Sequence, residues 1–80
     1  MDKYKVAIVD DDEVALENLS FELGKDARFF LKGTARNGKQ GKKLIAKVQP
    51  DLLFLDVELP DMTGMELLQE IRDSVSWNMR

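Results

Sequence analysis

The sequence predicts an α/β fold, a doubly wound parallel sheet with helices on both faces, from three observations. Short apolar runs at 5–9, 29–35 and 52–56 have the length and residue types of buried strands. Each run is followed by a segment in which apolar residues recur at helical spacing. Alternating strands and helices favour parallel strands joined by right-handed crossovers. The shortest such connections place the first strand between the other two, in the order 2-1-3.

The first strand, residues 5–9, leads into a helix that begins near Asp11 or Asp12. Either aspartate can cap this helix, because its carboxylate accepts hydrogen bonds from free N–H groups of the first turn. Glu13 favours the same helix end, and Gly24 indicates a C-terminal stop. The apolar residues at helical spacing are Ala15, Leu16, Leu19 and Leu23.

The second strand is expected over residues 29–35, and Asn37 and Gly38 open a helix that runs to about residue 48. Gly41 lies inside this helix, where glycine costs about 1 kcal/mol relative to alanine. We therefore expect this helix to be the weakest element. Its expected buried residues are Leu44, Ile45 and Val48.

Pro50 and Asp51 end that helix and begin the third strand, residues 52–56. A turn over residues 59–64 follows, in which Pro60 fixes the backbone and Gly64 frees the start of the next helix. That helix is expected over about residues 65–72, with one apolar face buried against the sheet. Its core residues are Leu67, Leu68 and Ile71. Residues 75–77 have the composition of the start of a further strand.

Composition restricts the class of function. Eighty residues make one small domain, close to the lower size limit at which an apolar core is sufficient without disulfides or structural metals. The chain has no cysteine or histidine, which excludes disulfides, thiolate or imidazole metal sites and histidine-based triads.

Charge and hydropathy restrict the partners and the compartment. Residues 25–47 carry eight Lys or Arg and one acid, whereas residues 10–22 carry six acids and no base. General nucleic-acid binding needs a continuous basic footprint, so we do not expect it. No apolar run approaches the roughly 20 residues of a membrane span, and the first residues lack the apolar stretch of a signal peptide. A soluble, cytoplasmic protein without membrane contact is expected.

The strongest functional indication is a pair of carboxylate clusters, each at the end of an apolar run. Asp10 and Asp11 follow the first strand, and Asp56 ends the third. Ligands of open parallel sheets bind beyond the carboxyl ends of the strands, where the strand order reverses. Like charges held close repel each other unless a cation joins them, and Mg²⁺ prefers one or two carboxylates with phosphate or water oxygens. The sequence therefore predicts a divalent-metal phosphoryl site.

Two motifs carry a family resemblance. Val-Ala-Ile-Val-Asp-Asp-Asp at 6–12 and Pro-Asp-Leu-Leu-Phe-Leu-Asp-Val-Glu-Leu-Pro-Asp-Met-Thr-Gly at 50–64 resemble the receiver domain of bacterial two-component response regulators. The resemblance covers the whole chain but only about the first two-thirds of a full receiver, whose flavodoxin-like sheet has the order 2-1-3-4-5. It implies that residues 1–80 form one receiver domain that is incomplete at its C-terminus.

The resemblance also implies roles for particular residues. Asp56 would be the phosphoacceptor, taking a phosphoryl group from a histidine kinase or phosphotransfer protein as an acyl phosphate. Mg²⁺ would be held by Asp10, Asp11, Asp56 and the backbone carbonyl of Glu58. Asp11 would be the more direct ligand, and Asp10 would act partly through water. Such a domain is a phosphoprotein of signal transduction and not an enzyme.

The sequence departs from a full receiver in its last third. A full receiver has a Ser or Thr after its fourth strand and a Lys after its fifth. This chain has no Lys after Lys47, and Ser74 and Ser76 come too early to fill the hydroxyl position. With three strands, the third strand would be an exposed apolar edge that another chain can pair with. We expect a homodimer through residues 52–55 or through a swapped tail, residues 75–80.

Three other interpretations stay open. The acids could serve only to stabilise a helix start and a turn, in a structural interaction module that is never phosphorylated. Asp10 and Asp12 also fit the start of a haloacid-dehalogenase-type phosphatase, with Asp10 as nucleophile, of which this chain would be a fragment. Residues 33–39 fit the first seven positions of a phosphate-binding P-loop. However, Gln40 stands where that motif needs Ser or Thr, and Gly33 falls within the predicted second strand.

Overall fold

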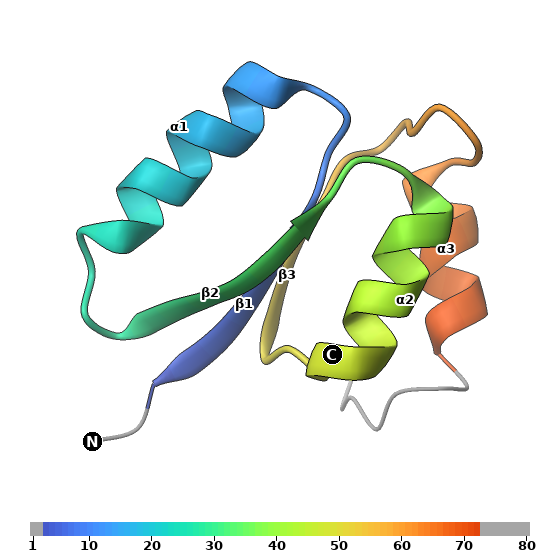
Figure 1. Ribbon diagram of the computed structural model, residues 1–80. Helices are drawn as coiled ribbons and strands as arrows, with labels where there is room; N and C mark the ends of the chain where they lie inside the picture. Colours follow the sequence, from blue (N-terminus) through green and yellow to red (C-terminus); the bar gives the residue numbers. More distant parts are fainter. Residues whose placement is uncertain (1–2, 73–80) are drawn as a thin grey trace.

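Figure 1 shows the computed structural model of the chain, which describes residues 3–72. The elements are β1 (Tyr4–Val9), α1 (Glu13–Gly24), β2 (Phe29–Ala35), α2 (Gly38–Val48), β3 (Leu52–Leu55) and α3 (Gly64–Ile71). β1 pairs in parallel with both β2 and β3, so the strand order is β2-β1-β3. α1 covers one face of the sheet, and α2 and α3 cover the other (Figure 1). The predicted fold class and the order 2-1-3 are confirmed.

Two apolar cores lie on opposite faces of the central strand. Successive side chains of β1 alternate between the faces, and every residue from Val6 to Val9 is at most 1% exposed. Burial on both faces explains why this strand reads as a continuous apolar run. On the α1 face, Val6 and Ile8 pack with Leu16 and Leu23. On the other face, the buried members are Val9, Ala35, Ile45, Leu59, Leu67 and Ile71.

The structure selects Asp12 as the cap of α1. Its carboxylate Oδ1 accepts hydrogen bonds from the N–H groups of Val14 and Ala15 at 3.0 and 3.4 Å. The expected stop at Gly24 is right in position and wrong in mechanism. α1 does end at Gly24, but Gly24 does not have a positive φ, and the next residue, Lys25, has a φ of −80°, so neither residue is left-handed. The helix ends through a tightened last turn, in which the Lys25 N–H donates to a carbonyl three residues back.

α2 begins at Gly38 with Asn37 as its N-cap, as predicted; the Asn37 side chain accepts a hydrogen bond from the Gln40 N–H at 2.8 Å. The predicted buried set needs correction: Ile45 is buried, Leu44 and Val48 are only half-buried, and Gly41 is buried as well. A Cβ on Gly41 would lie 3.0 Å from the Val9 side chain and 3.3 Å from that of Leu67. Glycine therefore lets α2 approach the sheet closely, a packing role that the helix-propensity argument missed.

β3 and α3 differ from the prediction by one residue at their ends. β3 ends at Leu55, so Asp56 lies just beyond the strand, and α3 spans 64–71 instead of 65–72. Thr63 and Glu66 form a reciprocal capping box at the start of α3, with bonds of 3.1 and 3.2 Å. Leu67 and Ile71 are buried as expected, and Leu68 is half-buried. The strand expected at 75–77 and the swapped tail lie outside the described residues.

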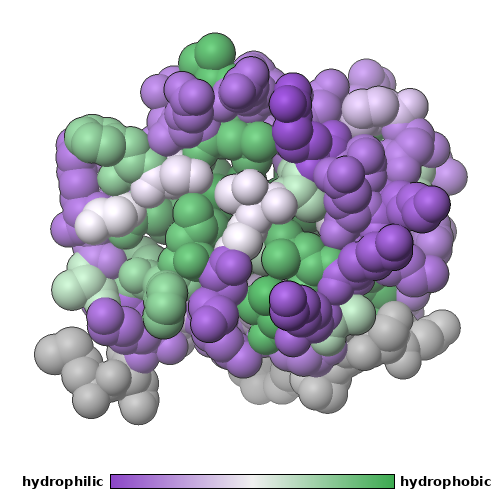
Figure 2. Space-filling view, in the orientation of Figure 1, coloured by the Kyte–Doolittle hydropathy of each residue, from purple (hydrophilic) through white to green (hydrophobic). Residues whose placement is uncertain are grey.

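Part of the basic segment, residues 38–47, lies in α2 and gives this helix a basic outer surface. Lys39, Lys43 and Lys47 follow one another at intervals of four residues and are all exposed. Figure 2 shows hydrophilic side chains over this side of the molecule, with apolar side chains in the gap between α1 and α2. Within residues 3–72, no helix is long and apolar enough to cross a membrane.

Replacing Gly41 with leucine is expected to destabilise the protein, because the new side chain must enter the space between α2 and β1. We expect the free energy of unfolding to fall by about 1–3 kcal/mol, the usual cost of overpacking a core. Urea denaturation followed by circular dichroism measures this change. Gly24→Leu is the matched control, since no atom lies within 4 Å of a Cβ at Gly24. Equal stability of the two variants would contradict the packing role of Gly41.

Candidate functional site

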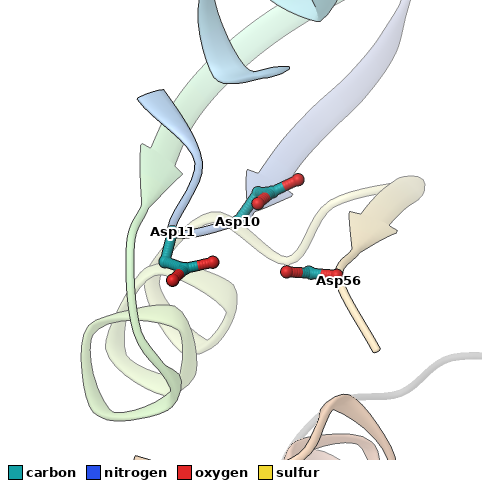
Figure 3. Close-up of side chains that lie close together, drawn as sticks. All are labelled: Asp10, Asp11 and Asp56. Carbon is teal, nitrogen blue, oxygen red and sulfur yellow. The ribbon is translucent and has the colours of Figure 1, made fainter. Parts of the chain in front are cut away.

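Asp10, Asp11 and Asp56 meet at the carboxyl end of the sheet. The first two continue from β1 and the third from β3, and these strands pair in parallel with Val9 opposite Leu55. The residues that follow the two strands therefore emerge side by side. One carboxylate oxygen from each aspartate lies within 4.8 Å of the others, and Figure 3 shows the three side chains around one gap. The structure thus brings together the three carboxylates that the sequence singled out.

Backbone contacts fix the positions of Asp10 and Asp56. The Asp56 N–H donates to the Val9 carbonyl at 2.9 Å, and the Asp10 N–H donates to the Ala35 carbonyl at 3.0 Å. These bonds continue the two parallel ladders by one residue beyond the strands. Gly64 packs against Asp56 from the other side, where any Cβ would collide with the Asp56 carbonyl oxygen. The sheet and the start of α3 together hold the Asp56 backbone in place.

The three consecutive aspartates have different structural tasks. Asp12 is committed to capping α1. Asp10 uses Oδ1 to accept a hydrogen bond from the Asp12 N–H at 2.9 Å, which leaves its second oxygen for another partner. Asp11 is exposed, and within residues 3–72 neither its carboxylate nor that of Asp56 accepts a hydrogen bond from protein. Two of the three clustered carboxylates are therefore fully available to a ligand.

The donor set fits a small, hard cation. Octahedral Mg²⁺ with oxygens at about 2.0–2.1 Å places adjacent ligand oxygens about 3 Å apart and opposite ones about 4.2 Å apart. The observed upper limit of 4.8 Å is slightly wider, so direct binding by all three residues needs a small side-chain rotation or a bridging water. Asp10 fits the water-bridged position best, because one of its oxygens already serves the Asp12 N–H.

The loop between β3 and α3 forms one wall of the site. An open hollow of about 510 Å³ is lined by Asp11, Asp56 and residues 57–60. The loop is closed by backbone hydrogen bonds from the Leu59 N–H to the Met62 carbonyl at 2.9 Å and from the Gly64 N–H to the Val57 carbonyl at 2.7 Å. Glu58 lies in this wall and its side chain is exposed.

The sequence reasoning missed Asp61, at the tip of this loop. Its carboxylate accepts hydrogen bonds from the N–H groups of Gly38 at 2.7 Å and Lys39 at 3.0 Å, in the first turn of α2. The bond from Gly38 is the main cause that holds the pKa of Asp61 below its usual value. The contact joins residues that are far apart in the sequence, so no local pattern could have indicated it.

Two of the alternative interpretations lose their structural basis. Gly33 lies inside β2, and a Cβ there would be 2.7 Å from the Leu44 side chain, so residues 33–39 do not form a phosphate-binding loop. The haloacid-dehalogenase interpretation pairs Asp10 with Asp12, but the Asp12 carboxylate is bonded to the first turn of α1.

Curated proteins with similar sequences include a methylesterase/glutaminase and a probable response regulator. The chain is 42% identical over 71 residues to the protein-glutamate methylesterase/protein-glutamine glutaminase of Geobacillus kaustophilus, covering 89% of this chain and 20% of that protein. It is 41% identical over 75 residues to the probable C4-dicarboxylate response regulator DctR of Bacillus subtilis, covering 88% of this chain and 31% of that protein. The chain therefore spans less than a third of the length of these relatives.

Solved receiver structures have the same arrangement of strands and helices. The response regulator domain of Thermotoga maritima CheB matches with a TM-score of 0.86 at 24% identity, covering 90% of this chain and 54% of that one. The receiver domain of the putative response regulator NarL from Mycobacterium tuberculosis matches with a TM-score of 0.86 at 26% identity, covering 91% and 59%. The family profile described as the response regulator receiver domain matches residues 6–78. With its three-stranded parallel sheet and clustered aspartates, this chain belongs to the response regulator receiver family.

Proposed function

We propose that this chain is the phosphoacceptor part of a two-component response regulator, acting in the cytoplasm, and that Asp56 accepts the phosphoryl group. The observation that carries the proposal is the cluster of three carboxylates beside an open hollow at the carboxyl end of the sheet. Membership of the receiver family supports the same role. The partner would be a histidine kinase or a phosphotransfer protein that presents a phosphohistidine.

Asp56 is the best-placed nucleophile of the three aspartates. It lines the hollow, its backbone is held by Val9 and Gly64, and its carboxylate has no protein hydrogen bond in the described chain. A carboxylate oxygen would attack the phosphorus in line. The new O–P bond forms while the N–P bond to the imidazole breaks, and the imidazole keeps the bonding electrons. The product on Asp56 is an acyl phosphate.

Asp10, Asp11 and Asp56, with the backbone carbonyl of Glu58, would hold Mg²⁺. When bound, Mg²⁺ offsets the negative charge of the carboxylates and of the incoming phosphoryl oxygens. Asp11 would bind directly, because it is exposed and, among residues 3–72, its carboxylate accepts no competing hydrogen bond; the bond from Arg36 at 3.3 Å goes to its backbone carbonyl. Asp10 would act through water, as its shared Oδ1 suggests. The residues themselves supply orientation, since both strand ends are fixed by the sheet.

We further propose that the chain belongs to one receiver unit that signals and does not itself catalyse a reaction on other substrates; it covers 54% and 59% of the two receiver structures described above. The methylesterase and glutaminase named for the Geobacillus relative belong to a protein of which this chain spans a fifth. No residue of the site described here supports an esterase, since the chain contains no histidine for a catalytic triad.

The phosphoacceptor role can be tested with a small phosphodonor. The chain incubated with Mg²⁺ and acetyl phosphate is expected to gain the mass of one phosphoryl group by intact-mass spectrometry. Asp56→Asn should abolish the gain because the nucleophilic oxygen is lost, and removing Mg²⁺ with EDTA should suppress it. Asp51→Asn is the matched control, since Asp51 accepts a hydrogen bond from the Lys5 N–H at 2.8 Å near the opposite end of β3.

Two results would overturn this assignment. Absence of any mass gain in the unsubstituted chain under all conditions would favour the structural module, in which the acids serve stability alone. A mass gain that persists in Asp56→Asn would place the acceptor on a different residue.

We also propose that the chain self-associates through the free edge of β3. In residues 3–72, β3 is paired only with β1, and its other edge has unpaired backbone groups. Apolar hollows flank this edge on both faces of the sheet. One of about 300 Å³ includes Leu19 and Phe54, and one of about 170 Å³ includes Leu55 and Leu68. Unpaired backbone groups beside apolar surface favour the addition of another strand.

Sedimentation velocity over a range of concentrations tests this second proposal. The average mass is expected to rise with concentration, and Leu52→Lys should shift the chain toward monomer because a charge on an edge strand opposes pairing. Phe21→Lys is the control, since Phe21 is an exposed apolar residue on α1 and not on β3. A monodisperse monomer at every concentration would refute self-association. Association that Leu52→Lys leaves unchanged would show that the β3 edge is not the interface.

A further inference from the structure

The loop that forms the wall of the site is attached to the protein at its tip as well as at its ends. Its ends are fixed where Asp56 bonds to β1 and where Gly64 begins α3. Its tip is fixed by Asp61, which bonds two N–H groups of α2. Residues 57–60, which line the hollow, lie between these attachment points.

Asp61 and Met62, which are consecutive in the loop, both contact Gly38 at the start of α2. Met62 packs against Gly38 so closely that any Cβ on Gly38 would collide with the Met62 side chain. Asp61 reaches the Gly38 N–H from the same loop. Gly38 therefore receives a polar contact and an apolar contact from consecutive residues, and a Cβ there would displace the Met62 side chain.

Asp61 is not needed to begin α2 in the usual way. Asn37 is already the N-cap, and its side chain satisfies the Gln40 N–H. The N–H groups of Gly38 and Lys39 are two that a helix leaves without an internal partner, and Asp61 satisfies both from a distant part of the chain. The negative carboxylate is also favoured by the positive end of the helix dipole. The hydrogen bond from the Gly38 N–H, followed by that from Lys39, also holds the pKa of Asp61 below its usual value.

We propose that Asp61 is a positioning residue for the metal and phosphoryl site. By bonding the tip of the loop to α2, it fixes the position of the loop backbone that contains Glu58. This inference rests on the proposed function, in which the Glu58 carbonyl is a ligand of Mg²⁺. Asp61 itself touches neither the cation nor the phosphoryl group. It acts through the backbone, because the Leu59–Met62 hydrogen bond joins the tip directly to the residue after Glu58.

The attachment can be measured without metal by hydrogen exchange at the Leu59 amide. In Asp61→Ala, which removes both acceptors, exchange at Leu59 is expected to become about tenfold faster or more, because the loop opens locally without global unfolding. Asp61→Asn keeps one acceptor oxygen for the Gly38 N–H and should give an intermediate rate. Asp51→Ala is the matched control, because it removes an aspartate that bonds a backbone N–H of β1 away from the loop.

The link to the site is measured by Mg²⁺ affinity, using isothermal titration calorimetry on the same proteins. Asp61→Ala is expected to weaken Mg²⁺ binding by about tenfold, the lower end of the effect of residues that orient ligands. Asp61→Asn should lie between Asp61→Ala and the unsubstituted chain, and Asp51→Ala should equal the unsubstituted chain. By reciprocity, Mg²⁺ should slow exchange at the Gly38 amide. Circular dichroism verifies that each variant is folded, and Asp61→Asn serves if Asp61→Ala is not.

Each outcome decides a separate statement. Unchanged exchange at Leu59 in the folded Asp61 variants would overturn the attachment itself. Faster exchange with unchanged Mg²⁺ affinity would overturn the positioning role while leaving the attachment. Failure of the unsubstituted chain to bind Mg²⁺ would refute the proposed function and the positioning role with it, and this is visible before any variant is compared.

Discussion

The parallel pairing of β1 with β3 is the constraint on which the site depends. Val9 stands opposite Leu55, and the Asp56 N–H bonds to the Val9 carbonyl. Because parallel strands present their carboxyl ends at the same edge of a sheet, this register alone brings the acids that follow β1 and β3 into one place. The arrangement is electrostatically unfavourable without a counter-charge. The apolar packing of β1, which is almost fully buried on both faces, offsets that cost.

Sequence reasoning predicted the features that depend on local pattern and chain order. The apolar runs, a cap of α1 at Asp11 or Asp12, the start of α2 at Asn37, and the meeting of Asp10 with Asp56 follow from residue type and from the rules for parallel sheets. It could not predict contacts that exist only after the elements pack. Gly41 was expected to weaken α2, because helix propensity considers the helix alone. In the structure, glycine at this position lets α2 pack closely against Val9. The left-handed conformation of Gln49, with a φ of 52°, had no sequence indication either.

The acids of this small domain are divided between stability and the site. Asp12, Asp61 and Glu66 each bond backbone N–H groups at a helix start or just before it, where negative charge is favoured. Asp10 contributes to both tasks, since its Oδ1 accepts the hydrogen bond from the Asp12 N–H in the β1–α1 turn and its carboxylate also belongs to the cluster. Counting acids in the sequence could not separate these roles, because the same residue type in the same short segment serves each of them. Hydrogen-bond geometry separates them.

β3 is only partly buried, so the stability of the site that follows it depends on what packs against the free edge of the sheet. β1 is buried on both faces and has two neighbours, whereas β3 has one neighbour within residues 3–72 and none of its four residues is buried. Asp56 follows directly from this strand, so its position depends on the hydrogen bonds between β1 and β3 and on the contact with Gly64. A second strand paired to β3 would add backbone bonds and bury Phe54 and Leu55. Any partner for that edge, from the same chain or another, would therefore also stabilise Asp56 and the loop after it.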